Sequence, residues 1–72
     1  MLSRTEVEKI KKSYTKGVRI ELIFMDDKIH PVPAGTLGYV KYVDDAGQIH
    51  MNWDNGRTIP IIEGVDRFKK VK

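Results

Sequence analysis

The side chains best suited to metal or acid–base chemistry lie together in one segment, MDDKIHPVPA, from Met25 to Ala34. Asp26, Asp27 and His30 bring two carboxylates and an imidazole into this segment, and such groups bind divalent metal ions. Their spacing matches no established ligand pattern, and aspartates are also ordinary turn-forming residues. Loops of this length between strands often have a binding role. We therefore expect these three residues to contribute to a binding surface and to hold no metal ion.

The chain lacks the residue combinations on which catalysis usually depends. Cysteine is absent, so the sequence offers no thiol nucleophile, thiolate zinc site or disulfide. His50 alternates to the strand face opposite Trp53, and nothing positions a nucleophile beside it or beside His30. Gly35 and Gly38 do not precede a helix, so they do not form a phosphate-binding loop. We expect a protein without catalytic activity and without a cofactor.

An aromatic segment in the middle of the chain suits binding instead. Tyr39 and Tyr42 flank Val40, and a β-bulge near Lys41 would decide which of the two tyrosines faces solvent. An exposed Tyr39 beside Leu37 would form an apolar patch, which is the usual mark of a site for a partner.

Basic residues near these tyrosines suggest a second kind of ligand. Arg19, Lys41 and Arg57 would supply positive charge, and a tyrosine ring can stack on a nucleic-acid base. Nucleic acid or a small nucleotide is therefore the alternative to a protein partner.

Length and charge limit the remaining classes of function. The chain has 72 residues and a net charge of +3, from 13 basic and 10 acidic side chains. No apolar run approaches the ~20 residues that cross a bilayer, and the N-terminal segment lacks the apolar core of a secretory signal. One soluble, cytoplasmic domain without a membrane partner is the expectation.

Basic residues crowd both ends of the chain, whereas acidic pairs lie in the predicted loops. If the two ends meet, they would form a basic face that attracts phosphate. The alternative is that these residues only keep a small protein soluble. The basic residues are Arg4, Lys9, Lys11, Lys12, Lys16 and Arg19 at one end and Arg67, Lys69, Lys70 and Lys72 at the other.

Residues 1–15 predict a short amphipathic helix, and residues 16–72 predict a β-domain. Ser3 and Glu6 fit a capping box. Apolar residues recur at spacings of three and four, so they form a stripe along one side of the helix. This stripe consists of Val7, Ile10 and Tyr14. Because so short a helix is unstable alone in water, the stripe must dock on the β-domain or on another subunit.

Alternating apolar and polar residues predict five short strands. The strands are expected at Val18–Phe24, Thr36–Val43, Gln48–Trp53, Arg57–Ile62 and Phe68–Val71. Strands this short can close into a small barrel, which limits exposed edges. Val18, Ile20, Leu22 and Phe24 fall on the predicted core side of the first strand. Trp53 is expected to fill the core as its largest side chain.

Three stretches, GVRIELIFMDD, PVPAGTLGYV and VDDAGQIHMNWDNG, together resemble a family of small SH3-like domains of unknown function. That family is frequent in Firmicutes, their phages and other mobile elements. The resemblance extends from Lys16 to about Val71 and leaves the helix outside. It implies a mainly β fold, a small five-stranded SH3-like barrel, to which this chain adds one short N-terminal α-helix. It also implies a bacterial cytoplasm, no catalytic chemistry, and an accessory role against host systems.

The sequence thus predicts a non-enzymatic binding module. The acidic loops and the exposed apolar candidates favour a protein partner over nucleic acid or a nucleotide. Self-association through the helical stripe is a related outcome, in which Val7, Ile10 and Tyr14 would dock on a second copy.

Overall fold

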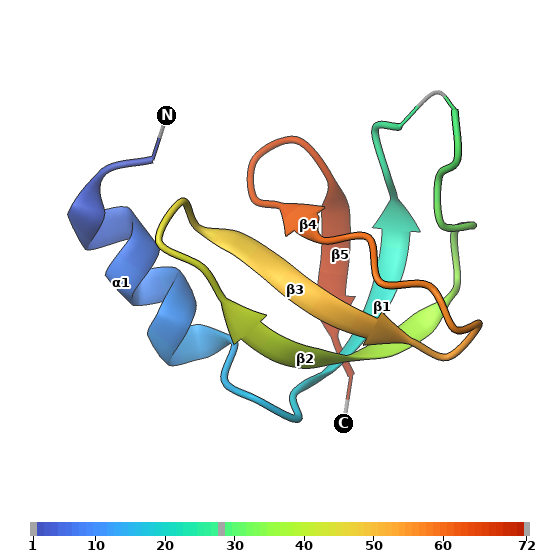
Figure 1. Ribbon diagram of the computed structural model, residues 1–72, viewed down its shortest axis with the longest axis horizontal. Helices are drawn as coiled ribbons and strands as arrows, with labels where there is room; N and C mark the ends of the chain where they lie inside the picture. The colour runs from blue at the N-terminus through green and yellow to red at the C-terminus, as the bar shows by residue number, and fades with distance from the viewer. Residues whose placement is uncertain (1, 28, 72) are drawn as a thin grey trace.

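One helix and five strands make up the part of the chain that the computed structural model describes, residues 2–27 and 29–71 (Figure 1). In chain order they are α1 (Arg4–Ser13), β1 (Arg19–Phe24), β2 (Leu37–Val43), β3 (Gln48–Trp53), β4 (Ile61–Ile62) and β5 (Arg67–Lys70). The prediction of a mainly β fold with five strands and one short N-terminal helix is confirmed.

The predicted capping box starts α1. The Ser3 hydroxyl accepts a hydrogen bond from the Glu6 N–H at 3.2 Å, and the Glu6 carboxylate accepts one from the Ser3 N–H at 3.0 Å. These hydrogen bonds from Ser3 hold the pKa of Glu6 below its ordinary value.

Within the described residues, no helix is long and apolar enough to cross a membrane.

The apolar stripe of α1 docks on the chain's own sheet. Val7 and Ile10 are buried, and Ile10 belongs to the main core. Tyr14 is half-buried and meets Phe68 of β5 edge to face, with ring centres 5.4 Å apart. The side chains of α1 also lie over Gly47, where an added Cβ would come within 3.4 Å of Val7. The stripe that could support self-association is therefore largely used within the chain.

The five strands form one antiparallel sheet in the order β4-β3-β2-β1-β5. The two edge strands, β4 and β5, follow each other in the chain and are separated only by residues 63–66. These residues form a tight turn, in which the N–H groups of Val65 and Asp66 donate to the Ile62 carbonyl oxygen at 3.1 and 2.9 Å. The sheet therefore curls until its two edges come close together. An isolated bridge between Glu63 and Asp66 lies in this connection.

The predicted bulge in the second strand is confirmed. The register of β2 against β3 shifts between Val40 and Tyr42, so Lys41 is the extra residue. A second shift, between Leu22 and Phe24, occurs where β1 pairs with β5. It overturns the prediction for Phe24, which is 54% exposed because the irregular register ends the simple alternation of core and solvent faces.

Trp53 lies in the core, as predicted. Its side chain is almost fully buried, and its indole N–H donates to the carbonyl oxygen of Ile59 at 2.8 Å. Gly38 makes room for the ring, since a Cβ there would lie 2.7 Å from Trp53 Cε3. The predicted fourth strand is much shorter than expected: of residues 57–62, only Ile61 and Ile62 pair with β3. Pro60, which has no N–H to donate, directly precedes this pair.

Candidate functional site

The structure divides the predicted binding residues into two groups. Four of them lie on β2 with their side chains away from the core: Leu37, Tyr39, Lys41 and Tyr42. The other four belong to the loop after β1 or contact it: Asp26, Asp27, His30 and Arg57. The first group, with the neighbouring Arg19, His50 and Asn52, is called the outer sheet face below.

Tyr39 is held in place by an ion pair from two other parts of the chain. The Arg19 guanidinium lies 4.2 Å from the centre of the Tyr39 ring. The same guanidinium donates two hydrogen bonds to the carboxylate of Asp54, at 2.7 and 2.5 Å. The hydrogen bond from Arg19 holds the pKa of Asp54 below its ordinary value. Half of the Tyr39 surface, 50%, remains exposed.

Tyr42 is supported in a similar way at the other end of the face. Its ring stacks on His50 with ring centres 4.4 Å apart and an angle of 10° between the planes. His50 Nε2 lies 2.8 Å from Asp44 Oδ2. The other carboxylate oxygen of Asp44 accepts the N–H groups of Ala46 and Gln48. Tyr42 is 53% exposed, so the stack positions the ring without hiding it.

Opposing effects set the pKa of the Asp44 carboxyl group. Burial raises it, but the hydrogen bonds from His50, Gln48 and Ala46 together hold it below its ordinary value. The charged carboxylate therefore organises the β2–β3 turn and orients the ring of His50 under Tyr42.

Sequence reasoning missed the supporting residues Asp44, Asp54 and His50, and also Asn52, which lies opposite Tyr39. Alternation places His50 and Asn52 on the polar side of β3, which is a weak signal. Their positions beside the tyrosines follow from the pairing of β2 with β3, in which Tyr39 opposes Asn52 and Tyr42 opposes His50. A shift of one residue would move these side chains to the other face.

Two residues of the second group, Asp27 and Arg57, form together with Asp66 what we call the loop clasp. Asp27 accepts the N–H groups of Ile29 and His30, and these hydrogen bonds hold its pKa below the ordinary value. Arg57 donates to the carbonyl oxygens of His30 and Pro31. The Asp27 carboxylate and the Arg57 guanidinium are thus engaged in holding the loop.

Asp66 is the central residue of the clasp and was not predicted. Its side chain is buried, with 7% exposed, and it accepts the N–H groups of Asp26 and Ile62 at 2.8 Å each. One carboxylate therefore ties the loop after β1 to the end of β4. Across the described residues, no group of three His, Cys, Asp or Glu side chains could hold a metal ion.

A family match covers nearly the whole chain. Residues 3–71 match the model of DUF4314, a domain of unknown function. The chain belongs to this family. The DUF4314 match includes α1, so the expectation from sequence that the family resemblance starts only at Lys16 was wrong. No curated protein and no solved structure matches the chain.

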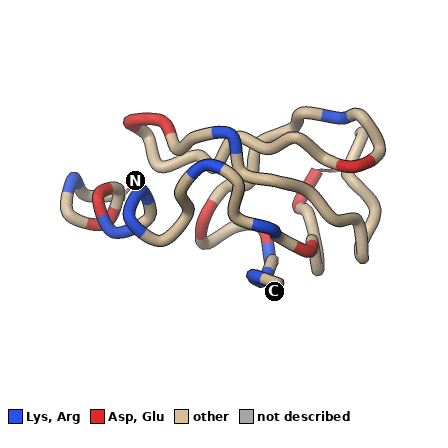
Figure 2. Tube along the Cα trace, turned by 90° about the horizontal axis from the view of Figure 1, so that it is seen from below, with Lys and Arg blue, Asp and Glu red and all other residues tan. Residues whose placement is uncertain are grey.

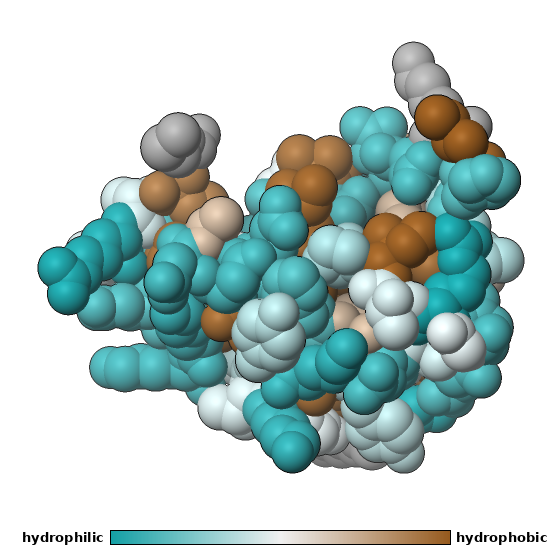
Figure 3. Space-filling model, in the orientation of Figure 1, coloured by the Kyte–Doolittle hydropathy of each residue, from teal (hydrophilic) through white to brown (hydrophobic). Residues whose placement is uncertain are grey.

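Charge on this DUF4314 domain is mixed. Basic and acidic segments alternate along α1 and around the sheet (Figure 2), and ion pairs join Lys11 to Asp45 at 2.7 Å and Arg19 to Asp54. Polar and apolar side chains are likewise interspersed on the face seen in Figure 3. The mixed pattern gives little support to a single basic face for phosphate.

Proposed function

We propose that this DUF4314 domain is a non-enzymatic protein-binding module and that the outer sheet face is its contact surface. The observation that carries the proposal is the pair of half-exposed tyrosines, each braced by a side chain from a neighbouring strand. Tyrosine is enriched among the residues that contribute most to protein interfaces. Rings already held in one orientation lose little conformational entropy on binding.

The charges around the tyrosines favour a protein over nucleic acid. A carboxylate accompanies each ring, Asp54 through Arg19 and Asp44 through His50. Each carboxylate offsets the positive charge that its basic partner could offer, which leaves less positive charge beside the rings to attract phosphate. Arg19 and His50 also each cover one side of a ring, which leaves less area for stacking on bases.

The resemblance to domains of phages and mobile elements supports a bacterial host protein as the partner that we propose, for example a component of a defence system. In that role the domain would act by occupying a surface of the host protein. Such an action needs a contact surface and no catalytic group.

Site-specific photocrosslinking in a bacterial host lysate tests this proposal. A photoreactive phenylalanine replaces Tyr42 in one preparation and the exposed Lys12 of α1 in the control. We expect one protein adduct at position 42 that survives nuclease treatment and is absent at position 12. The purified partner should then bind the Tyr39→Ala and Tyr42→Ala variants at least about tenfold more weakly, as expected for central interface tyrosines.

Two results would contradict the proposal. Adducts of equal yield at positions 42 and 12 would show that the outer sheet face has no preferred partner. Recovery of nucleic acid alone, with an affinity that falls steeply as salt rises, would assign the face to nucleic-acid binding instead.

A further inference from the structure

The edge strand β5 presents open backbone groups in a defined register. The Val71 N–H donates to the Arg19 carbonyl oxygen at 3.0 Å, and Lys70 and Phe68 oppose Ile20 and Leu22. In an antiparallel pair, hydrogen-bonded and non-hydrogen-bonded positions alternate. The N–H and C=O groups of Phe68 and Lys70 therefore point away from β1, toward the free edge. No hydrogen bond to these groups occurs among residues 2–27 and 29–71.

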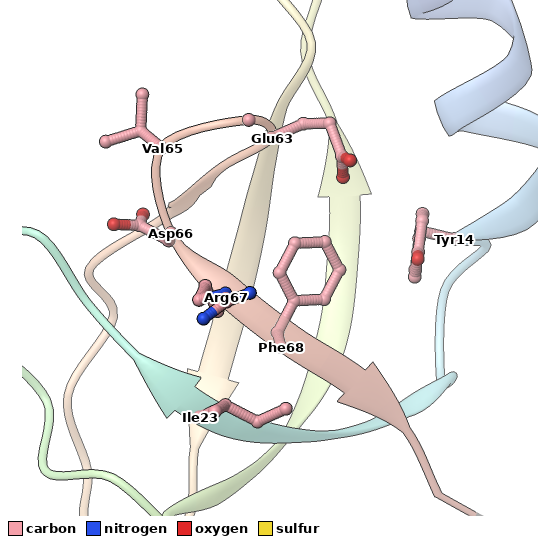
Figure 4. A pocket seen from close by; sticks show the side chains of 8 residues that line it. Tyr14, Ile23, Glu63, Val65, Asp66, Arg67 and Phe68 are labelled. Atoms are coloured by element: carbon pink, nitrogen blue, oxygen red, sulfur yellow. The ribbon is translucent and has the colours of Figure 1, made fainter.

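A groove lies beside this part of β5. Its volume is about 610 Å³, and Figure 4 shows around it side chains from β1, β5, the β4–β5 turn and Tyr14, the residue that follows α1. Phe68 and Tyr14 form an aromatic wall, and Val65 lies at the opposite side of the opening. The groove thus offers room and apolar contacts next to unpaired backbone groups.

Side chains alternate between the two faces of β5. Phe68 and Lys70 lie on the side of Tyr14, where Lys70 Nζ is 4.9 Å from the centre of the tyrosine ring. Arg67 and Lys69 lie on the other side, as alternation requires. One face of any strand added here would meet the aromatic rings and Lys70. The other face would meet Arg67 and Lys69, whose Nζ also lies 3.8 Å from Glu21 Oε1 on β1.

This charge pattern selects the occupant. A second copy pairing through its own β5 would place basic side chains opposite basic side chains, which destabilises a sheet. We propose that β5 instead accepts an extended segment of another protein in which apolar and acidic residues alternate. The backbone of that segment extends the sheet at Phe68 and Lys70, as in other complexes formed by strand addition. Its acidic residues face Arg67 and Lys69, and its apolar residues face Phe68 and Tyr14.

Glu63 further limits where the acidic residues of the added segment can lie. Its carboxylate lines the same groove on the side of Tyr14 (Figure 4), and Coulombic interaction with it is one of the causes, after burial, that raise the pKa of Tyr14. An acidic residue on the aromatic side of the added strand would be repelled by Glu63. The residue of the segment that lies beside Glu63 is therefore apolar, and the acidic residues of the segment lie on the face of Arg67 and Lys69.

Peptide titration followed by NMR of the full chain tests the proposal. The probe is acetyl-Val-Glu-Val-Glu-Val-Glu amide, and the charge control is the same peptide with lysine in place of glutamate. We expect the acidic probe to shift the amide signals of Phe68 and Lys70 most strongly. It should bind at least about tenfold more tightly than the lysine peptide, because opposite charges then face each other across the strands.

Backbone pairing is tested by blocking it. Two forms of the acidic probe carry N-methyl groups, one on its valines and one on its glutamates. Because alternate N–H groups of a paired strand point to opposite sides, we expect only the form methylated on the side facing β5 to lose binding. Lys70→Pro removes the outward N–H and should weaken binding, whereas Lys70→Ala loses the same charge and keeps that N–H. Equal binding of both methylated forms, or signal shifts confined to other residues, would overturn the proposal.

This site is independent of the outer sheet face. The Tyr39→Ala and Tyr42→Ala variants leave β5 unchanged and should bind the acidic probe like the wild type. Loss of the probe site would therefore leave the proposed function standing, and the reverse also holds.

Discussion

The loop clasp and the outer sheet face contain similar residues but use them differently. In the clasp, the carboxylates and the guanidinium bind backbone N–H and C=O groups, so their polar atoms are engaged in holding the chain. On the outer sheet face, the Arg19 guanidinium and the His50 imidazole brace aromatic rings and leave about half of each tyrosine exposed.

The difference shows how to separate polar residues that hold the fold together from polar residues that can contact a partner. A carboxylate that satisfies buried backbone groups cannot be released without leaving those groups unpaired. A side chain that stacks on an exposed ring keeps that ring oriented toward a partner. The comparison predicts that clasp substitutions change stability and that outer-face substitutions change binding.

The largest effect is expected for Asp66→Ala. The substitution leaves the Asp26 and Ile62 N–H groups, which are part-buried, without their acceptor, and removing one partner of such a hydrogen bond costs about 1–3 kcal/mol. We expect the free energy of unfolding to fall by about 3 kcal/mol, measured by urea denaturation.

The matched control is Asp45→Ala, which removes an exposed carboxylate paired only with Lys11. Its effect should stay below about 0.5 kcal/mol, as for most surface ion pairs. A loss below about 1 kcal/mol for Asp66→Ala would show that the clasp is not a structural unit.

A smaller effect is expected from acid acting on Asp44. Its pKa is lowered in the folded state, so the unfolded chain takes up the proton first as pH falls. The stability that Asp44 contributes is present above about pH 4 and is lost as pH drops through the lower pKa of the folded state. Asp44→Asn should flatten this loss in urea unfolding series between about pH 7 and pH 3.

Asp45→Asn is the control for this series, because it removes a neighbouring charge and leaves the hydrogen bonds of the β2–β3 turn intact. An identical acid profile for wild type and Asp44→Asn would show that this carboxylate does not couple the turn to pH.

The smallest effect on stability is expected on the outer sheet face. Tyr39→Ala removes a half-exposed ring and one contact with Arg19, and such a contact is worth about 0.5–1 kcal/mol at an exposed site. Thermal and urea unfolding should place the loss within about 1 kcal/mol. A loss above about 2 kcal/mol would make Tyr39 a structural residue and end the distinction between the two regions.

The local features of the fold could be predicted because their signals are short in sequence. The capping box at Ser3 and the bulge at Lys41 involve residues a few positions apart, and the third strand is found at its predicted bounds, Gln48–Trp53. Phe24 was misplaced because its exposure depends on how β1 pairs with β5, which is distant in sequence.

The candidate site was predictable only in part for the same reason. Tyr39 and Tyr42 were expected to compete for one exposed position, and both are exposed. The bulge turns Tyr42 outward, and pairing with β3 supplies His50 beneath it. Asp26, Asp27 and His30 were grouped by proximity in sequence, but the Asp27 carboxylate binds backbone N–H groups of the loop itself.

By itself, the sequence determined the helix start, most strand positions, the buried tryptophan and membership of a family whose function is unknown. Which polar side chains remain exposed for a partner depends on contacts between residues far apart in the chain, so it could be read from the folded structure alone. Curling of the sheet brings Asp66 to the loop after β1, and strand register sets Arg19 beside Tyr39 and His50 under Tyr42. Local sequence patterns do not identify such long-range partners, because a shift of one residue in strand register would give each side chain a different neighbour.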